Sequence, residues 1–364
     1  MVRSPRVLLF ALLVGLTATA CFSPGGTGGG TGGAPGGGTA PPAGGGTPPG
    51  GGGGTTPPGS GTGDQNGSLG TCPGFPPDGA NYVGWGVDVS TMAADPNSAN
   101  YVTNILANGG DYLHPDFGGG GDYGIPYVTV PGTQTPVPVT WTAYGNQSDP
   151  GPYKTPLGAP IEGGAASSGD RHVISIDRDN CILYELYRAF PQTDHWDADS
   201  GVDWDLRSSA LRTPTWTSAD TAGLPIFPGL VRYDEIAAGV INHALRFTVN
   251  ATRHGYVLPA THWASDSTDA NRPPMGLRLR LSAAYDIAGF TGQSRVILEA
   301  LKKYGMIVAD NGSNWYITGA ADSRFDDDDL DQLKTVPGSA FEVVDTGDVC
   351  TTEDGSQPQS VCGP

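Results

Sequence analysis

Positive charge is scarce in this sequence. Its 364 residues include 19 lysines and arginines against 37 aspartates and glutamates. Arg3 and Arg6 lie in an N-terminal segment of signal-peptide type, so 17 basic residues remain against 37 acidic ones, a net charge of −20. Nucleic-acid-binding proteins carry basic patches, so we expect no nucleic-acid partner. The acidic excess favours solubility at an exposed surface.

The sequence motifs of several enzyme classes are also absent. The chain has no Cys-x-x-Cys, no His-Glu-x-x-His and no cluster of cysteine and histidine, which disfavours a zinc site. It has no Gly-x-Ser-x-Gly and no Ser-x-x-Lys, which disfavours serine hydrolases of those types. Without an internal repeat, propellers and solenoids are disfavoured as well.

The N-terminus has the features of an export signal. A basic start precedes the apolar residues 7–16, which are too few to span roughly 30 Å of hydrocarbon. The small residues Ala18 and Ala20 then precede Cys21, and this run resembles the lipobox of bacterial lipoproteins, with Ala18 where leucine is commoner. The resemblance implies that residues 1–20 are removed and that Cys21 is lipidated. The alternative is an ordinary signal peptide cut near Ala20, with Cys21 incidental.

A low-complexity stretch follows the cysteine. Residues 22–70 are almost wholly glycine, threonine, proline, serine and alanine, with Asp64 as the only charge. Such a segment has no apolar face to bury, so we expect residues 21–70 to form a disordered stalk. Random-coil scaling gives it a reach of roughly 40 Å. Anchor and stalk predict a location in the cell envelope, facing the periplasm or the extracellular space, with the lipid bilayer as a partner.

Residues 71–364 are expected to form one β-rich globular domain with a polar C-terminal tail. An exported domain folds in an oxidising compartment, where its four cysteines are expected to pair. Cys350 and Cys362 would close a short loop in the tail, so we predict a disulfide between them. That leaves Cys72 for Cys181, with a free, buried Cys181 as the alternative.

Alternation of apolar and polar residues with a period of two dominates the domain. It is clearest over 277–285 and 240–249, and it predicts a hairpin of strands 172–178 and 181–188 with a turn at Asp179-Asn180. Further strands are predicted at 123–130, 137–144 and 314–318. Half-polar alternation of this kind is typical of antiparallel sheets with one solvated face.

Helical patterns are few. The best covers 291–305, where an apolar stripe ends at Gly305, and a second short helix is predicted to start among the acids at 326–329. We therefore predict a mainly β fold: an antiparallel β-sandwich, jelly-roll-like, with one or two short packed helices.

Five segments of the domain resemble a group of secreted proteins from soil and environmental bacteria. The segments are LHPDFG at 113–118, DPGPYKTPLGAPIEGG at 149–164, GDRHVISIDRDNCILYELY at 169–187, GLPIFPGLVRYDE at 223–235 and GMIVADNGSNWYITG at 305–319. The resemblance covers roughly residues 85–345. It implies a secreted, β-rich protein and carries no activity with it.

Carboxylates on neighbouring strands are the first catalytic candidates. Asp177 and Asp179 are two residues apart and would point the same way on a strand, and Glu185 lies on the next strand. Glycoside hydrolysis needs two such groups, one as acid and the other as base or nucleophile. The alternative is that Asp177 and Asp179 shape a turn and accept hydrogen bonds from nearby backbone N–H groups.

Asp234 and His262 complete the catalytic candidates. Asp234 lies in a segment bounded by proline and glycine, and the alternative is a structural ion pair with Arg232. His262 lies in a loop-like stretch, where an imidazole can act as a general base or simply occupy the surface.

Candidate glycan-binding residues are arginines on polar strand faces and tryptophans. Arg246, Arg278 and Arg280 would bind a carboxylated or sulfated glycan if their faces line one groove, and otherwise would pair with surface acids. Trp216 and Trp263 would stack on sugar rings if exposed and would fill the core if buried.

Asp197, Asp199 and Asp203 alternate along an acidic segment that contains a glycine, as in calcium loops with oxygen ligands. The segment lacks the full EF-hand spacing, and the alternative is a solvated acidic turn. Apart from this structural calcium, we expect no cofactor.

Three functions fit these features: a surface-tethered enzyme that cleaves polysaccharide, hydrolase before lyase; a glycan-binding lipoprotein without catalysis; and a structural protein of the envelope. An enzyme predicts a groove with two carboxylates, and a binder predicts an aromatic platform without them. Fold class alone does not decide between the three.

The anchor can be tested by replacing the cysteine. We expect Cys21→Ser to move the protein from the membrane fraction to the soluble fraction, because the lipid would be lost. Fractionation of cells without detergent, followed by immunoblotting, measures this. A wild-type protein that is already fully soluble would show that Cys21 carries no lipid.

Overall fold

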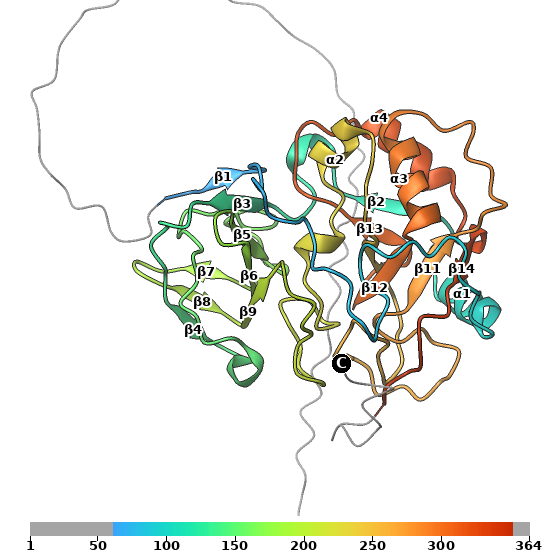
Figure 1. Ribbon diagram of the computed structural model, residues 1–364, viewed down its shortest axis with the longest axis horizontal. Coiled ribbons are helices and arrows are strands. Elements are labelled where there is room, and N and C mark those ends of the chain that lie inside the picture. Colours follow the sequence, from blue (N-terminus) through green and yellow to red (C-terminus); the bar gives the residue numbers. More distant parts are fainter. Residues whose placement is uncertain (1–60, 352–364) are drawn as a thin grey trace, which may run out of the picture. The chain divides into compact units, whose positions relative to one another are not determined.

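The computed structural model describes residues 61–351, which form several β-sheets with few short helices (Figure 1). A five-stranded sheet has the order β1-β3-β5-β6-β9. Its strands are β1 (Asp64–Gln65), β3 (Tyr127–Val130), β5 (Val173–Asp177), β6 (Ile182–Tyr187) and β9 (Ser200–Asp205). The predicted hairpin of β5 and β6 is confirmed as an antiparallel pair at the centre of this sheet.

The folded part begins earlier than the sequence indicates. Asp64–Gln65 were expected in the stalk, but they pair with β3, and Asp64 forms an ion pair with Arg178 (Oδ2–Nη1 2.6 Å). Cys21 and residues 22–60 lie outside the described residues, so the anchor and the rest of the stalk stay predictions.

A six-stranded sheet has the order β14-β11-β12-β10-β13-β2. Its strands are β2 (His114–Asp116), β10 (Leu245–Val249), β11 (Arg278–Leu281), β12 (Met306–Asn311), β13 (Tyr316–Thr318) and β14 (Phe341–Val343). A three-stranded sheet, in the order β4-β8-β7, consists of β4 (Val139–Trp141), β7 (Phe190–Pro191) and β8 (Trp196–Ala198).

The predicted jelly-roll sandwich is not confirmed, because the sheets mix strand directions. The pairs β3–β5, β4–β8, β10–β12 and β13–β2 are parallel. The strands expected over 240–249 and 277–285 are also shorter, running from Leu245 to Val249 and from Arg278 to Leu281. Alternation shows that a segment has a buried face, but it does not specify the partner strand or its direction.

Helices are α1 (Ser98–Ala107), α2 (Tyr233–Ala238), α3 (Gly292–Lys303) and α4 (Asp327–Leu330). Both predicted helices are confirmed. Gly305 follows the end of α3 with φ +70°, and a Cβ there would lie 2.1 Å from the Leu279 carbonyl oxygen, so the stop requires glycine. Asp326 caps α4, its carboxyl accepting hydrogen bonds from the N–H groups of Asp328 and Asp329.

Both faces of the five-stranded sheet are covered. Ile174 and Ile176 pack with Phe227 in one apolar cluster, while Val173 packs with Trp196 of β8 in another. The largest cluster lies over the six-stranded sheet and includes the inward residues of α1 and α3. Polar residues that alternate along β5 and β6 are therefore buried rather than solvated, which corrects the expectation of an open sheet face.

One disulfide joins the start of the folded part to the hairpin. Cys72 and Cys181 are bonded across 109 residues of sequence, which decides between the two alternatives that the sequence left open for Cys181. Cys350 is also disulfide-bonded. Cys362 lies outside the described residues, so the pairing of Cys350 with Cys362 stays a prediction.

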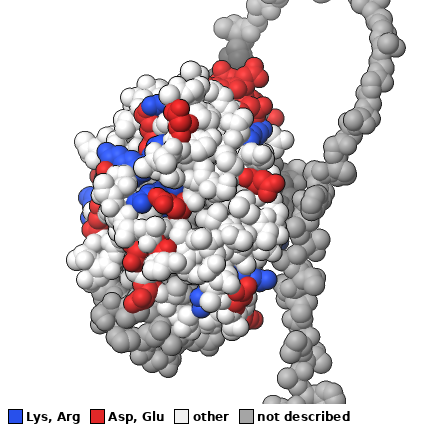
Figure 2. Space-filling model, turned by 90° about the vertical axis from the view of Figure 1, so that its right-hand side faces the viewer, with Lys and Arg blue, Asp and Glu red and all other residues white. Residues whose placement is uncertain are grey.

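Charged side chains are interspersed on the face shown in Figure 2, where lysine and arginine lie next to aspartate and glutamate amid a largely uncharged surface. Within residues 61–351, no helix combines the length and the apolar character needed to cross a bilayer.

The Cys72–Cys181 crosslink should contribute strongly to stability. A closed loop of about 100 residues restricts the unfolded chain, so Cys72→Ala/Cys181→Ala should lower the free energy of unfolding by about 3–5 kcal/mol. Urea denaturation followed by far-UV circular dichroism measures the change. An unchanged denaturation midpoint would contradict the expected contribution.

Candidate functional site

Six ionisable side chains from both larger sheets and their loops form a buried cluster, here called the Asp220 cluster. Its members are Glu162, His172, Glu185, Asp220, Arg246 and Asp310. Glu185 comes from β6 of the five-stranded sheet, whereas Arg246 and Asp310 come from β10 and β12 of the six-stranded sheet. Titratable groups gathered in this way are typical of functional sites.

The Asp220–Arg246 ion pair is the centre of the cluster. Arg246 Nη2 lies 2.9 Å from Asp220 Oδ1, and the two side chains are 5% and 1% exposed. Arg246 Nη1 also donates to the hydroxyl of Thr318 on β13 (2.8 Å). A buried guanidinium needs such partners, because an unpaired charge in the interior costs several kcal/mol.

Two carboxyls of the cluster are shifted toward the protonated form. Burial, with the negative charge of Asp220, raises the pKa of Asp310 to about 6, although Thr221 and Arg246 oppose the shift. Burial raises the pKa of Glu185 to about 7, even though Glu185 accepts hydrogen bonds from the N–H groups of Ile226 and Phe227. Carboxyls that keep a proton near neutral pH can serve as general acids.

His172 and Glu162 form a second ion pair in the cluster. His172 Nδ1 lies 2.7 Å from Glu162 Oε2, and His172 Nε2 lies 3.1 Å from the Ala219 carbonyl oxygen. Burial alone lowers the pKa of His172, but Glu162 outweighs it and raises the pKa to about 9. Glu162 responds in the opposite sense: burial raises its pKa, and His172 brings it below the usual value.

The cluster reaches solvent on the side of Glu162 and Asp310, which are both partly exposed. Asp116, at the end of β2, is within electrostatic reach of Glu162 and Arg246. Desolvation raises the pKa of Asp116, and its side chain lines a pocket of about 490 Å³ together with His114, Phe117 and Lys334. Asp116 therefore lines an open pocket and also interacts electrostatically with Glu162 and Arg246 of the cluster.

Three residues predicted from the sequence meet in this region. Glu185 and Arg246 belong to the cluster, and His262 Nδ1 lies 2.8 Å from the carbonyl oxygen of Thr221, the residue after Asp220. Burial lowers the pKa of His262. Sequence reasoning did not select Asp220, Asp310, Glu162 or His172 as site residues, since none of the four belongs to a motif with a known spacing.

The other predicted catalytic residues lie elsewhere. Asp177 is buried at the β5–β6 turn, where it pairs with Lys154 (2.6 Å) and accepts hydrogen bonds from the N–H groups of Asp179 and Asn180. Asp179 accepts a hydrogen bond from the N–H of Gly132 (2.7 Å). These contacts match the alternative interpretation, in which Asp177 and Asp179 shape a turn and accept hydrogen bonds from backbone N–H groups.

Asp234 also lies apart from the cluster. It sits on the exposed side of α2 and forms an ion pair with Arg324 (2.9 Å), not with Arg232. Arg232 instead pairs with Glu235, which also contacts the buried His243 (Oε2–Nε2 3.1 Å).

The prediction that Arg246, Arg278 and Arg280 line a solvated groove is wrong, because all three side chains are buried. Arg278 donates to the carbonyl oxygens of Gly84 and Tyr304 (both 2.7 Å). Arg280 pairs with Glu342 (2.9 Å). Both guanidinium groups therefore tie the six-stranded sheet to neighbouring backbone and side chains. Trp263 is partly buried and stacks on Tyr256, with ring centroids 5.8 Å apart.

The acids predicted to bind calcium do not converge. Asp197 lies 3.3 Å from His195, whereas Asp199 pairs with Arg188 (3.2 Å) and accepts a hydrogen bond from Thr142. Asp203 lines a different pocket. Over the described range 61–351, no group of three or more histidine, cysteine, aspartate or glutamate side chains is arranged to hold a metal ion.

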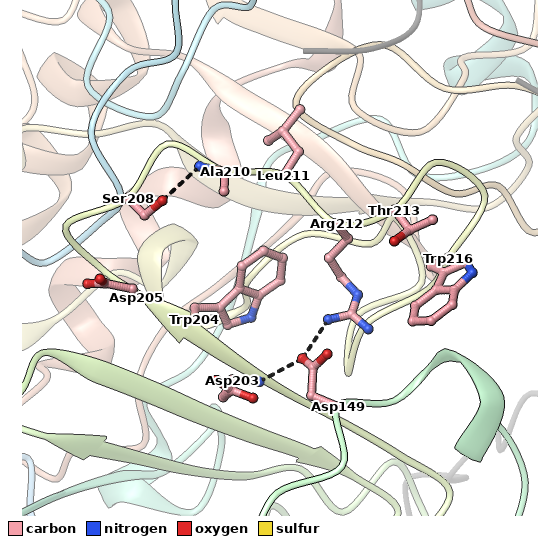
Figure 3. Close-up of a pocket in the computed structure, with 10 residues that line it drawn as sticks. All are labelled: Asp149, Asp203, Trp204, Asp205, Ser208, Ala210, Leu211, Arg212, Thr213 and Trp216. Atoms are coloured by element: carbon pink, nitrogen blue, oxygen red, sulfur yellow. Dashed lines mark hydrogen bonds and ion pairs between the residues drawn. The ribbon is translucent and has the colours of Figure 1, made fainter.

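A second open feature is the pocket between Trp204 and Trp216, here called the Trp204–Trp216 pocket (Figure 3). Its volume is about 290 Å³. Trp216, a predicted glycan-binding residue, therefore does line a pocket, together with Arg212, Asp149 and Asp203.

Comparison with models of known protein families, with curated proteins and with solved structures finds no match to this chain.

The His172–Glu162 pair yields a direct test. In the wild-type protein the His172 imidazole should titrate near pH 9, and in Glu162→Gln its pKa should fall below 6.5, because burial then dominates. The raised pKa means that the stabilisation from this histidine is complete below about pH 6.5 and is lost as the pH rises through about 9. An NMR titration of the imidazole carbons measures both values.

His195 is the internal control, since it is partly exposed beside Asp194 and should titrate identically in both proteins. A wild-type His172 that titrates near 6.5 would show that Glu162 does not hold its proton.

Proposed function

We propose that this chain is a surface-tethered lipoprotein that hydrolyses extracellular polysaccharide at the Asp220 cluster. One observation carries the proposal: the partly exposed Asp310 and Glu162 both interact with Arg246, and their pKa values are shifted in opposite directions. Two carboxyl groups whose pKa values are shifted apart in this way are typical of an acid and a base in one catalytic site.

The proposed roles follow from the protonation states. Asp310, with a pKa of about 6, donates its proton to the glycosidic oxygen as the bond from that oxygen to the anomeric carbon breaks. Glu162, ionised beside His172, takes a proton from water while the hydroxyl adds to the anomeric carbon. Arg246 and Asp220 position the site, since Arg246 attracts both carboxyl groups and Asp220 holds Arg246 in place.

Polysaccharide is the proposed substrate for two reasons. The predicted lipid anchor and stalk would hold the domain at the cell surface, where polymers are available and their products stay near the cell. In addition, the Trp204–Trp216 pocket combines indole rings with carboxylates, a combination that suits sugar rings and their hydroxyl groups.

A second candidate function is glycan binding without cleavage. The Trp204–Trp216 pocket favours it, because this pocket contains the features of a sugar site without requiring the Asp220 cluster to react. A structural role in the envelope would leave both features without a ligand.

The test compares three variants against a panel of neutral and acidic polysaccharides, with new reducing ends as the readout. Asp310→Asn and Glu162→Gln should each lower kcat by at least about 100-fold, because each removes a proton-transfer group. Asp234→Asn is the matched control and should behave as wild type, since Asp234 lies on α2 outside the cluster. Activity should fall as the pH rises through about 6, where Asp310 loses its proton.

Full cleavage by Asp310→Asn and Glu162→Gln would contradict the assignment of the two residues. Binding without reducing ends in the wild-type protein would support the glycan binder, and neither binding nor cleavage would leave the structural role. Melting temperatures of all variants distinguish loss of chemistry from loss of fold.

A further inference from the structure

The Trp204–Trp216 pocket is built from the end of β9 and the loop that follows it. Asp203 and Trp204 come from β9, Arg212 and Trp216 come from the loop, and Asp149 comes from the segment before β5. Figure 3 shows the Arg212 guanidinium between the two indole rings. It lies 5.8 Å from the Trp204 ring centre and 5.9 Å from that of Trp216. This arrangement fixes both rings relative to one charged group.

Arg212 is held in place by hydrogen bonds. Its Nη1 lies 2.9 Å from Asp149 Oδ2, its Nε donates to the Thr217 carbonyl oxygen (2.8 Å), and its side chain is 5% exposed. Asp149 Oδ2 also accepts a hydrogen bond from the main-chain N–H of Asp203 (3.1 Å). The positive charge in the pocket is therefore already neutralised.

Two polar groups of the pocket form no hydrogen bond or ion pair with another residue in the range 61–351. Trp204 is 8% exposed, and its buried indole N–H has no hydrogen-bond acceptor within residues 61–351. Figure 3 places this nitrogen on the side of the ring that faces Arg212. The Asp203 carboxyl, which is exposed, forms no hydrogen bond or ion pair with another described residue. An unpaired buried donor costs roughly 1–3 kcal/mol, which a ligand acceptor would recover.

These groups match the surface of a sugar ring. An indole stacks on the apolar face of the ring, a carboxylate accepts hydrogen bonds from hydroxyl groups, and an N–H donates to a ring or hydroxyl oxygen. The charges select among sugars, because Arg212 is neutralised by Asp149 while Asp203 remains unpaired. An incoming carboxylate or sulfate would meet Asp203 without a free cation to bind it.

We propose that the Trp204–Trp216 pocket binds a neutral or amino-bearing sugar unit of the polysaccharide and rejects uronic or sulfated units. This inference rests on the proposed function and adds the substrate class. Trp216 supplies the stacking platform, Asp203 accepts from sugar hydroxyl or ammonium groups, and the Trp204 indole N–H donates to a ligand oxygen. The pocket shares no lining residue with the Asp220 cluster, so binding does not require cleavage.

The test uses the full-length chain carrying Asp310→Asn, so that no ligand is cleaved during the measurement. Three hexasaccharides are the probes: a β-1,4-glucan, a chitosan and an oligogalacturonate. Binding is measured by calorimetry, and the indole N–H resonances are followed by NMR. The glucan or the chitosan hexamer should shift the Trp204 and Trp216 indole signals, whereas the oligogalacturonate should bind at least tenfold more weakly.

Two substitutions identify the groups responsible. Trp216→Ala should weaken binding at least tenfold, whereas Trp141→Ala should leave it unchanged, since Trp141 is a partly exposed indole on β4 outside the pocket. Asp203→Asn should reduce the difference in affinity between the neutral and the acidic probes, because it removes the negative charge that repels the acidic one.

Equal affinity for the acidic and neutral probes, unchanged binding by Trp216→Ala, or no indole shift with any probe would overturn the inference. Failure of this inference can be distinguished from failure of the hydrolase proposal. Binding at the pocket by a wild-type protein that releases no reducing ends would uphold the inference and refute hydrolysis. Cleavage of polysaccharide with a KM that is unchanged in Trp216→Ala would uphold hydrolysis and refute sugar binding in the pocket.

Discussion

Burial of the Arg246 guanidinium is the constraint on which the rest of this structure depends. A strand of the six-stranded sheet carries this charge into the interior, and Asp220 must come from a loop to neutralise it. The ion pair thereby fixes the loop beside β10. It also places a negative charge near Asp310 and a positive charge near Glu162. The ion pair thus adds to the burial that raises the pKa of Asp310 and to the His172 contact that lowers the pKa of Glu162.

Local elements of this fold could be predicted from the sequence, whereas their assembly could not. The β5–β6 hairpin, α3 with its glycine stop and the acid-capped α4 all follow from periodicity and capping, which act over a few residues. The mixed strand directions depend on contacts between residues far apart in the chain. The same limit explains the error over sheet faces. Ser175 and Glu185 alternate with apolar residues and lie on opposite faces of the sheet, yet both are buried, because each face is covered by another layer.

The candidate site shows the same division. Glu185 was recognised as a carboxylate on a strand next to other carboxylates, Arg246 as a guanidinium on a strand face, and Trp216 because indoles often contact sugars. Asp220 and Asp310 could not be recognised, since an aspartate in a loop or at a strand end resembles many solvated ones. What distinguishes them is desolvation, and desolvation is a property of the packed structure. Arg278 and Arg280 illustrate the opposite case, in which residues of a suitable type serve packing alone.

The disulfide between Cys72 and Cys181 determines how the domain would respond to mechanical load. A pull on the N-terminal end of the chain would first strip β1, whose two residues precede the crosslink. The tension would then pass through the sulfur atoms directly to the β5–β6 turn. The intervening residues, including α1 and β2 to β5, would bear none of it. A protein held by one end against flowing liquid would therefore yield only a short length of chain before a covalent bond took the force.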